Sequence, residues 1–372
     1  MKATIERANL LRSLGHVQSV VERRNTIPIL SNVLIEALSD GSMRLMATDL
    51  DLQINETMEA ASVEVAGSTT VSAHTLFDIV RKLPEGTQVS LTASDGKMQV
   101  VAARSRYSLN TLPRDDFPII AEGELPTKFE LPAATLRQMI DKTRFAISTE
   151  ETRYYLNGLY LHTVVENGET KLRAVATDGH RLALAEMPAP EGAAGSPGVI
   201  VPRKTVQEAR RLLETAGETV ELHLSPAKVR FNFGRAALTS KVIDGSFPDY
   251  ARVIPRDNNR VLIVDNALFA AAVDRVATIS AEKSRSVKMA VEPGRVILTV
   301  RNMEAGQAVE EVEVDYEGEG FEIGFNARYL LDVAGQIQEN TAEFRFADPA
   351  SPTLVLDPAD AGVRYVLMPL RV

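Results

Sequence analysis

The stretch KLRAVATDGHRLAL at 171–184 has a counterpart earlier in the chain, RLMATDLDLQI at 44–54. In both, apolar residues alternate as they do in a half-buried β-strand, and the strand ends in Ala-Thr-Asp. The two aspartates, Asp49 and Asp178, lie 129 positions apart. A degenerate third counterpart, VILTVRNMEA, places Asn302 a further 124 positions along the chain. A pattern that recurs at this spacing predicts a fold built from similar copies.

Two further patterns recur at nearly the same spacing. A strand that enters a helix through a polar cap occurs three times, and a pair of alternating strands follows that helix each time. Equivalent positions are Val71, Val201 and Gly324 in the first pattern and Val89, Val220 and Ala342 in the second. Each copy also opens with apolar residues at three- and four-residue spacing, which is typical of a one-sided helix. The chain is therefore predicted to contain three copies of a unit of about 125 residues, each ordered as helix, strands, helix and strands.

The joints between copies are marked by two Phe-Pro pairs, Phe117-Pro118 and Phe247-Pro248. Proline lacks an amide donor and favours extended geometry in the residue before it, as a linker requires. The predicted domains are 1–122, 128–254 and 260–372.

The composition is that of a folded, soluble protein. Of the 372 residues, 45% are hydrophobic and 24% are charged. No apolar run approaches the roughly 18–20 residues of a membrane helix, and the N-terminus does not resemble a secretory signal. The chain has no cysteine, which excludes disulfides, zinc–thiolate sites and thiol nucleophiles. A cytoplasmic location is expected.

Positive charge is concentrated in the predicted helices although the net charge of the chain is −9. These helices carry 17 Lys and Arg against 9 Asp and Glu, a net +8, so the rest of the chain carries −9 − 8 = −17. One explanation is that solvent-facing helices collect Lys and Arg. The other is that the helices of all copies share a surface that attracts a polyanion through its backbone, since no groove-reading motif accompanies the charge. The ranges counted are 8–24, 72–83, 134–146, 202–214, 266–288 and 326–339.

Asp178 and His180 raise the alternative of an enzyme, as an acid–base pair or as metal ligands. A catalytic base needs an orienting group and a nucleophile within reach, and the histidines at 16, 74, 162, 180 and 223 have no metal-binding spacing. Neither a Walker loop nor a GxGxxG motif is present. Because Asp49 repeats the aspartate without a histidine nearby, the aspartate is predicted to hold a turn. We therefore expect no catalytic residue, no cofactor and no metal.

Several longer motifs carry a resemblance to a known family. They are RYYLNG (153–158), ATDGHRLA (176–183), VIVPRK (199–204), TSKVIDGSFPDYARVIP (239–255), IGFNARYLLDV (323–333) and YVLMPLRV (365–372). In these motifs the chain resembles the bacterial sliding clamp, the β subunit of DNA polymerase III. The resemblance implies an α+β protein of three similar clamp domains, each with helices on one face of antiparallel sheets, which forms a ring as a head-to-tail homodimer. Such a ring encircles duplex DNA without sequence preference and acts as a processivity factor in replication. A peptide-binding scaffold that does not encircle DNA is the alternative.

The resemblance also implies a pocket between the second and third domains. It would receive short peptide motifs of the replicative polymerase α subunit, the clamp loader and repair proteins. Gly179 would let a peptide backbone approach closely. The chain departs from its relatives at Ser284, Leu367 and Leu370, which leaves the depth of the pocket open. The implied lining residues are Leu156, Thr177, Gly179, His180, Arg181, Leu182, Pro248, Arg252, Val253, Asn326, Tyr329, Val366, Met368, Pro369 and Arg371.

Two other surfaces follow from the resemblance. DNA contacts would include a loop arginine, a tyrosine pair and basic residues of the helices, whereas the nearby Glu150 replaces a commoner uncharged amide. These DNA-binding candidates are Arg24, Tyr154, Tyr155, Arg137, Lys142, Arg203, Lys204, Arg210 and Arg275. An exposed strand edge that carries apolar residues needs a partner, so we expect a homodimer. Its interface candidates are Arg104, Arg106, Tyr107 and Leu109 on one side and Ile279, Glu304, Glu310 and Glu311 on the other.

Overall fold

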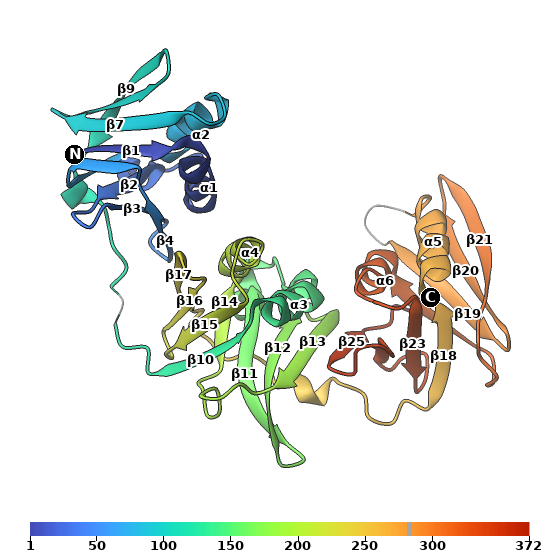
Figure 1. The fold of residues 1–372 in the computed structure, drawn as a ribbon. Coiled ribbons are helices and arrows are strands. Elements are labelled where there is room, and N and C mark those ends of the chain that lie inside the picture. Colours follow the sequence, from blue (N-terminus) through green and yellow to red (C-terminus); the bar gives the residue numbers. More distant parts are fainter. Residues whose placement is uncertain (122, 281–284, 372) are drawn as a thin grey trace. The chain divides into compact units, whose positions relative to one another are not determined.

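Figure 1 draws the computed structural model, which describes residues 1–121, 123–280 and 285–371. The chain divides into two compact units. The first unit contains Met1–Arg137 and Pro190–Val242, and the second contains Gln138–Ala189 and Ile243–Val372. Each unit therefore holds one terminal copy of the repeat together with part of the central copy.

The three copies share one order of elements: a strand, a helix, four strands, a second helix and three strands, with one extra strand, β5, in the first copy. The first copy contains β1 (Lys2–Glu6), α1 (Arg7–Gln18), β2 (Asn32–Ala37), β3 (Ser42–Thr48), β4 (Leu52–Glu59), β5 (Ser62–Val65), β6 (Gly67–Ser72), α2 (Ala73–Lys82), β7 (Gln88–Ser94), β8 (Lys97–Ala102) and β9 (Ser105–Leu112). The second contains β10 (Thr127–Pro132), α3 (Ala133–Thr143), β11 (Gly158–Glu166), β12 (Glu169–Thr177), β13 (Arg181–Pro188), β14 (Val199–Pro202), α4 (Arg203–Leu212), β15 (Thr219–Leu224), β16 (Lys228–Asn232) and β17 (Ala236–Lys241). The third contains β18 (Arg260–Asp265), α5 (Asn266–Ala277), β19 (Ser286–Glu292), β20 (Arg295–Asn302), β21 (Gly306–Glu313), β22 (Phe321–Asn326), α6 (Ala327–Ala334), β23 (Thr341–Phe346), β24 (Thr353–Leu356) and β25 (Val363–Leu367).

All six predicted helices occur in the described part of the chain, and each is shorter than predicted. The largest error is at 266–288, where α5 ends at Ala277 and β19 follows. Val287 and Met289 in that strand are both fully buried and alternate with more exposed residues, so their spacing there has the period of a strand. Polar side chains cap the starts of α1, α2, α5 and α6; the Asp265 side chain, for example, accepts the backbone N–H of Leu268 at 2.9 Å. The polar cap predicted for α4 is wrong, because Pro202 precedes that helix and makes no side-chain cap.

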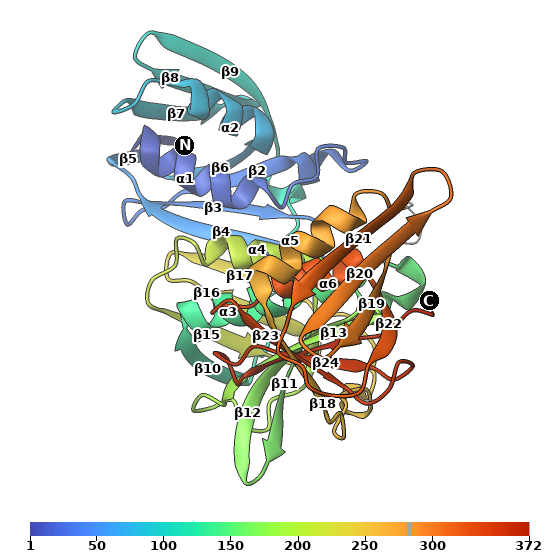
Figure 2. The same cartoon turned by 90° about the vertical axis from the view of Figure 1, so that its right-hand side faces the viewer.

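The excess of positive charge on the helices remains when the charges are counted within the shorter observed helices. The observed helices carry 12 Lys and Arg against 5 Asp and Glu. The excess lies in α1 to α4, because α5 and α6 each carry one basic and one acidic residue. The helices pack in pairs on one face of their sheets, α1 beside α2 and α5 beside α6 (Figures 1 and 2).

Strands from successive copies join into continuous sheets. In the first unit the order is β10-β15-β16-β17-β4-β3-β2-β6-β9-β8-β7-β1-β5, and in the second unit β11-β12-β13-β25-β24-β23-β18 and β21-β20-β19-β22. At what we term the first junction, β17 pairs antiparallel with β4, so that Ala236 lies opposite Glu56. At the second junction, β25 pairs antiparallel with β13, so that Val363 lies opposite Ala185. The last strand of one copy thus always joins the strand after the Asp-centred turn of the copy before it.

The segments with the Phe-Pro pairs cover these sheets. Phe117 is buried in a cluster with Leu34 and Met46 of the first copy. Phe247 stacks on Tyr160, with ring centroids 4.8 Å apart, and packs against the core cluster that contains Tyr250. Each linker is therefore a packed strap over the sheet rather than a free connection.

Candidate functional site

Three hairpin turns share one hydrogen-bond pattern. Asp178 Oδ1 accepts the backbone N–H groups of the residues two and three positions later, at 2.9 and 3.0 Å. Asp49 does the same at 3.0 and 2.8 Å, and Asn302 at 2.8 and 3.1 Å. The structural role predicted for the aspartate is confirmed, because this carboxylate holds the turn in a copy with a histidine and in a copy without one.

The turn in the second copy differs from that in the first by its glycine. Gly179 has a φ of +86°, and Leu50 at the equivalent position has a φ of +81°. A Cβ at Gly179 would lie 2.4 Å from Arg153 Nη1, so a side chain there would displace the Arg153 guanidinium. The glycine therefore leaves room for the Arg153 guanidinium, which lies against the turn and lines the pocket.

A pocket of about 250 Å³ lies beside this turn in the second unit. Its walls come from the β12–β13 hairpin, the linker after β17, the end of β25, and the 3-10 helix Glu151–Leu156. The lining is mainly apolar, as suits a binding cleft. The lining residues are Arg153, Tyr155, Leu156, Thr177, Gly179, Arg181, Leu182, Pro248, Val253, Val366 and Met368.

Nine of the residues implied by the resemblance line this pocket, and two lining residues were missed. Arg153 is absent from the set that the resemblance implies, and the resemblance implies a DNA contact for Tyr155. Both lie in the 3-10 helix, where Tyr154 is 54% exposed while Tyr155 turns toward the pocket. The tyrosine rings meet edge to face at 5.7 Å. No period-3.6 or period-2 pattern marks so short a helix, so the sequence offered no signal for which tyrosine faces inward.

The other predicted pocket residues surround the lining or lie outside it. The exposed His180 ring lies beside Tyr329 at a centroid distance of 6.4 Å, and Asn326 caps α6 through the N–H of Arg328. Burial raises the pKa of the Tyr329 hydroxyl, so it remains protonated at neutral pH. Arg252 forms an exposed ion pair with Asp249. Pro369 and Arg371 follow β25 in the C-terminal tail, and Ser284 lies outside the described residues.

Arg181 forms one wall of the pocket, but carboxylates of the same unit already neutralise its charge. Its side chain is 7% exposed, and its guanidinium bonds to Asp178 at 3.1 Å and to Asp332 of α6 at 2.5 Å. It also donates to the carbonyl of Phe145 and lies 4.3 Å from the centroid of the Tyr329 ring. Arg181 thus fixes the turn of the second copy to the helix of the third, and it presents the flank of its side chain rather than a free cation.

The predicted DNA contacts divide into exposed and paired residues. Arg24, Tyr154, Arg137 and Arg203 are exposed. Four predicted helix contacts lie beside carboxylates of the same unit. They are Lys142, which is 3.6 Å from Asp357, Lys204, which is 2.7 Å from Asp49, Arg210, which is 3.1 Å from Glu214 one turn further along, and Arg275, which bonds to Glu310.

Lys142 is the least accessible of these four residues. It is 5% exposed, and its amine contacts the buried Asp357 and the Gln336 carbonyl. We expect Lys142→Ala to lower the free energy of unfolding by about 3 kcal/mol, because a buried carboxylate is left unpaired. Arg137→Ala, on the exposed side of the same helix, should change it by less than about 0.5 kcal/mol. Chemical denaturation followed by circular dichroism measures both, and equal effects of the two substitutions would contradict the assignment.

The predicted interface strands present open edges. β9 pairs with β8 along its length but with β6 only at Leu112 and Thr111, so residues 105–110 have one unpaired edge. β21 is the edge strand of its sheet, with Val309 57% exposed. Ile279, just after α5, is half-buried. Among the predicted acids, Glu310 contacts Arg275 and Glu311 lies 3.1 Å from Arg295, so these carboxylates already have partners within the chain.

None of the helices within the described residues combines the length and the apolar character of a membrane span. No group of three or more His, Asp or Glu side chains there could hold a metal ion.

Comparison with known proteins gives matches along the whole chain. Models described as the N-terminal, central and C-terminal domains of the DNA polymerase III beta subunit match residues 1–121, 130–249 and 251–371. The beta sliding clamp of Caulobacter vibrioides strain NA1000 is 71% identical over 374 residues, covering 100% of both chains. A crystal structure of the C. crescentus beta sliding clamp has a TM-score of 0.97 at 70% identity and covers 100% of this chain and 99% of that one. The Bartonella birtlesii sliding clamp bound to griselimycin has a TM-score of 0.97 at 49% identity, with 100% of both chains covered.

Proposed function

Since this chain belongs to the family of DNA polymerase III beta subunits, the bacterial sliding clamps, we propose that it closes with a second copy into a ring around duplex DNA and tethers the replicative polymerase there. The chain is a processivity factor. A closed ring cannot leave duplex DNA sideways, so the tethered polymerase stays at high effective concentration near its primer end.

The strand pairing supports head-to-tail closure and carries this proposal. In both junctions within the chain, the last strand of a copy joins the strand after the turn of the preceding copy. The same rule, applied once more, joins β9 of one chain to β21 of its partner. Arg106 holds the place of Ala237 and Arg364, so it would lie opposite Val309 of the partner subunit. Basic residues on β9 would then approach acidic residues on β21.

The pocket beside Gly179 is the proposed site for partner peptides. It is small and mainly apolar, so an extended segment with leucine and aromatic side chains suits it. The rigid wall around Arg181 supports this, because a preformed cleft avoids the ordering cost of binding. The proposed partners are the polymerase α subunit, the clamp loader and repair proteins.

For DNA, we propose loop contacts by Arg24 and Tyr154, with Arg137 and Arg203 as helix contacts. All four are exposed, and arginine pairs with phosphate while tyrosine stacks on or bonds to nucleotides. The net positive charge of α1 to α4 supports contact with the DNA backbone without sequence readout.

Three further properties are proposed for the protein. It has no catalytic activity, which is supported by the use of the Asp178 carboxylate in a turn. It works in the cytoplasm, associated with the nucleoid during replication. Its domain boundaries are those predicted from the Phe-Pro pairs, at 1–122, 128–254 and 260–372.

Retention on DNA tests the ring directly. Labelled protein loaded on nicked circular DNA should stay bound and should dissociate when the circle is cut. Equal release from circular and linear DNA would contradict the proposal of a closed ring and would favour a scaffold that binds peptides without encircling DNA. Measurement of peptide binding in the same preparation separates these two functions.

Salt dependence tests the basic helices and the loop arginine. The affinity of the dimer for duplex DNA should fall steeply between about 50 and 200 mM salt, because each phosphate contact releases counterions. Arg24→Ala should reduce the slope of log affinity against log salt by about one. Arg345→Ala, in β23 and paired with Glu343 of the same strand, is the matched control and should leave the slope unchanged. An affinity independent of salt would contradict an electrostatic lining.

A further inference from the structure

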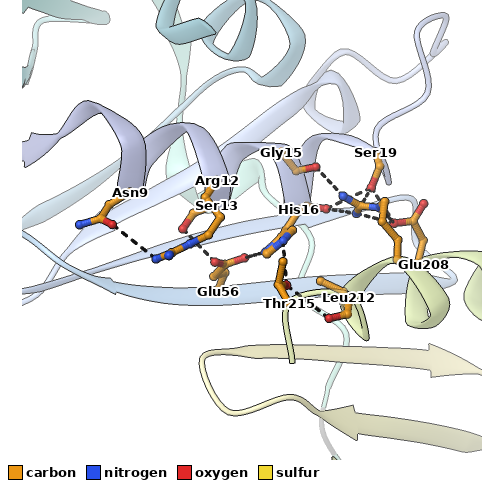
Figure 3. Close-up of polar contacts among 11 residues, drawn as sticks. Asn9, Arg12, Ser13, Gly15, His16, Ser19, Glu56, Glu208, Leu212 and Thr215 are labelled. Carbon is orange, nitrogen blue, oxygen red and sulfur yellow. Dashed lines mark hydrogen bonds and ion pairs between the residues drawn. The ribbon is translucent and has the colours of Figure 1, made fainter. Parts of the chain in front are cut away.

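A second cavity, of about 550 Å³, lies at the first junction, entirely within the first unit. It is bounded by α1, β4, the segment after α4, and the hairpin between β16 and β17. Figure 3 shows the polar side chains on its floor. Leu212 and Phe233 form apolar walls, and Arg12 and Arg235 line the opening.

The floor of this cavity is fully hydrogen-bonded. Glu56 is 3% exposed; its carboxylate lies 2.6 Å from His16 Nδ1 and accepts from Ser13 Oγ at 2.9 Å. The other nitrogen of His16 lies 3.2 Å from the Thr215 hydroxyl (Figure 3). Arg12 differs from these groups. Its only hydrogen bond is a long one of 3.5 Å to Asn9, and no carboxylate among the described residues pairs with it.

The second junction shows what fills the equivalent space in the same fold. Arg12 is the sixth residue of α1, and Gln138 is the sixth residue of α3. Gln138 donates to Asp360 Oδ2 at 2.9 Å. Asp360 belongs to the β24–β25 hairpin, in which seven residues separate the paired Leu356 and Arg364. The chain thus places its own carboxylate against that helix position at the second junction.

The first junction lacks this insertion. In the β16–β17 hairpin only four residues separate the paired Asn232 and Ala237, so the hairpin is three residues shorter and carries no acid. Arg12 therefore faces open space where Gln138 meets a carboxylate. An arginine binds a carboxylate more strongly than glutamine does, because its two parallel N–H groups match the two oxygens.

We propose that this cavity binds a carboxylate ligand, with the Arg12 guanidinium in the role that Gln138 has toward Asp360. The ligand is a small dicarboxylate or an acidic side chain of a peptide, since the carboxylate chemistry is the same for both. The cavity falls within the size range of small-ligand sites, and Arg235 at its opening is paired with the exposed Glu59 at 3.7 Å, which leaves Arg12 as the cation for the ligand. Its apolar walls suit the short carbon chain of such a ligand.

Titration calorimetry on the full-length dimer tests the proposal with two probes. One is succinate, and the other is a capped peptide, Asp-Pro-Ala-Asp-Ala-Gly, copied from the hairpin at 357–362. At least one probe should bind, and Arg12→Ala should weaken that binding by about tenfold or more. Arg12→Lys, which keeps the charge but loses the paired N–H groups, should give an intermediate affinity. Arg23→Ala removes an exposed cation outside the cavity and should have no effect.

The outcomes separate the two sources of the carboxylate. Binding of succinate supports a free dicarboxylate ligand, and binding of the peptide alone supports an acidic segment of a partner protein. The absence of binding by both probes overturns the proposal, and so does binding that Arg12→Ala leaves unchanged. If Arg12→Ala reduces DNA retention and alters neither probe, Arg12 is a DNA contact and the cavity has no carboxylate ligand.

Discussion

A chain with Tyr107 and Leu109 both changed to aspartate will sediment as a monomer and will leave nicked circular DNA as fast as linear DNA. Both side chains lie on the more buried face of β9, whose edge at 105–110 is unpaired within the chain. Two carboxylates placed in an apolar subunit contact lose hydration without gaining partners, which costs several kcal/mol. We therefore expect the dimer dissociation constant to rise at least about 100-fold.

The same strand provides the control. Ser108 and Asn110 alternate with these residues and are exposed, so a chain with both changed to aspartate adds equal charge on the opposite face. It should remain a dimer in sedimentation equilibrium and should be retained on circular DNA. If both double variants behave alike, β9 does not form the subunit contact.

Ending the chain at Leu367 will abolish binding of a partner peptide while leaving the dimer intact. Leu367 is the last residue of β25 and is buried, so the strand and its pairing with β13 are retained. The removed tail takes with it Met368, a wall of the pocket. Truncation of a central contact commonly costs about 2 kcal/mol or more, so the affinity for a Gln-Leu-x-Leu-Phe peptide should fall at least about 30-fold.

Two measurements decide this prediction. Calorimetry gives the peptide affinity, and sedimentation with retention on circular DNA gives the state of the ring. Arg371→Ala, which changes the same tail without altering the pocket lining, should bind the peptide nearly normally. If the truncated chain binds the peptide with unchanged affinity, the pocket is not the peptide-binding site, whether or not the truncation changes retention on circular DNA.

Much of the architecture was predictable from the sequence because one period organises it. Asp49, Asp178 and Asn302 align by their spacing alone, and they hold three equivalent turns. Helix ends were less predictable. The helix predicted over 266–288 runs into β19, because α5 ends at Ala277 and the buried Val287 and Met289 have the two-residue spacing of a strand.

The site was predictable in its residues more than in their roles. The resemblance implied most of the residues that line the pocket. Lys142 and Lys204, in contrast, were predicted as DNA contacts only because they are basic residues on helices. Both amines form ion pairs with carboxylates far away in the sequence, Asp357 and Asp49, and such pairing depends on how strands of different copies meet. Arg181 is a similar case, because the acid on α6 that neutralises it is 151 positions away.

The Phe-Pro straps have a consequence for how a ring of these chains would open. Each junction within the chain has two attachments, the strand pairing and a covalent linker whose phenylalanine is packed against the sheet. The contact between β9 and β21 of the partner subunit would have the strand pairing alone, because no linker crosses it. A force that separates domains would therefore break the strand pairing between the two chains before it strains either linker within a chain. The ring would open at the contact between its two chains, where no covalent bond joins the domains.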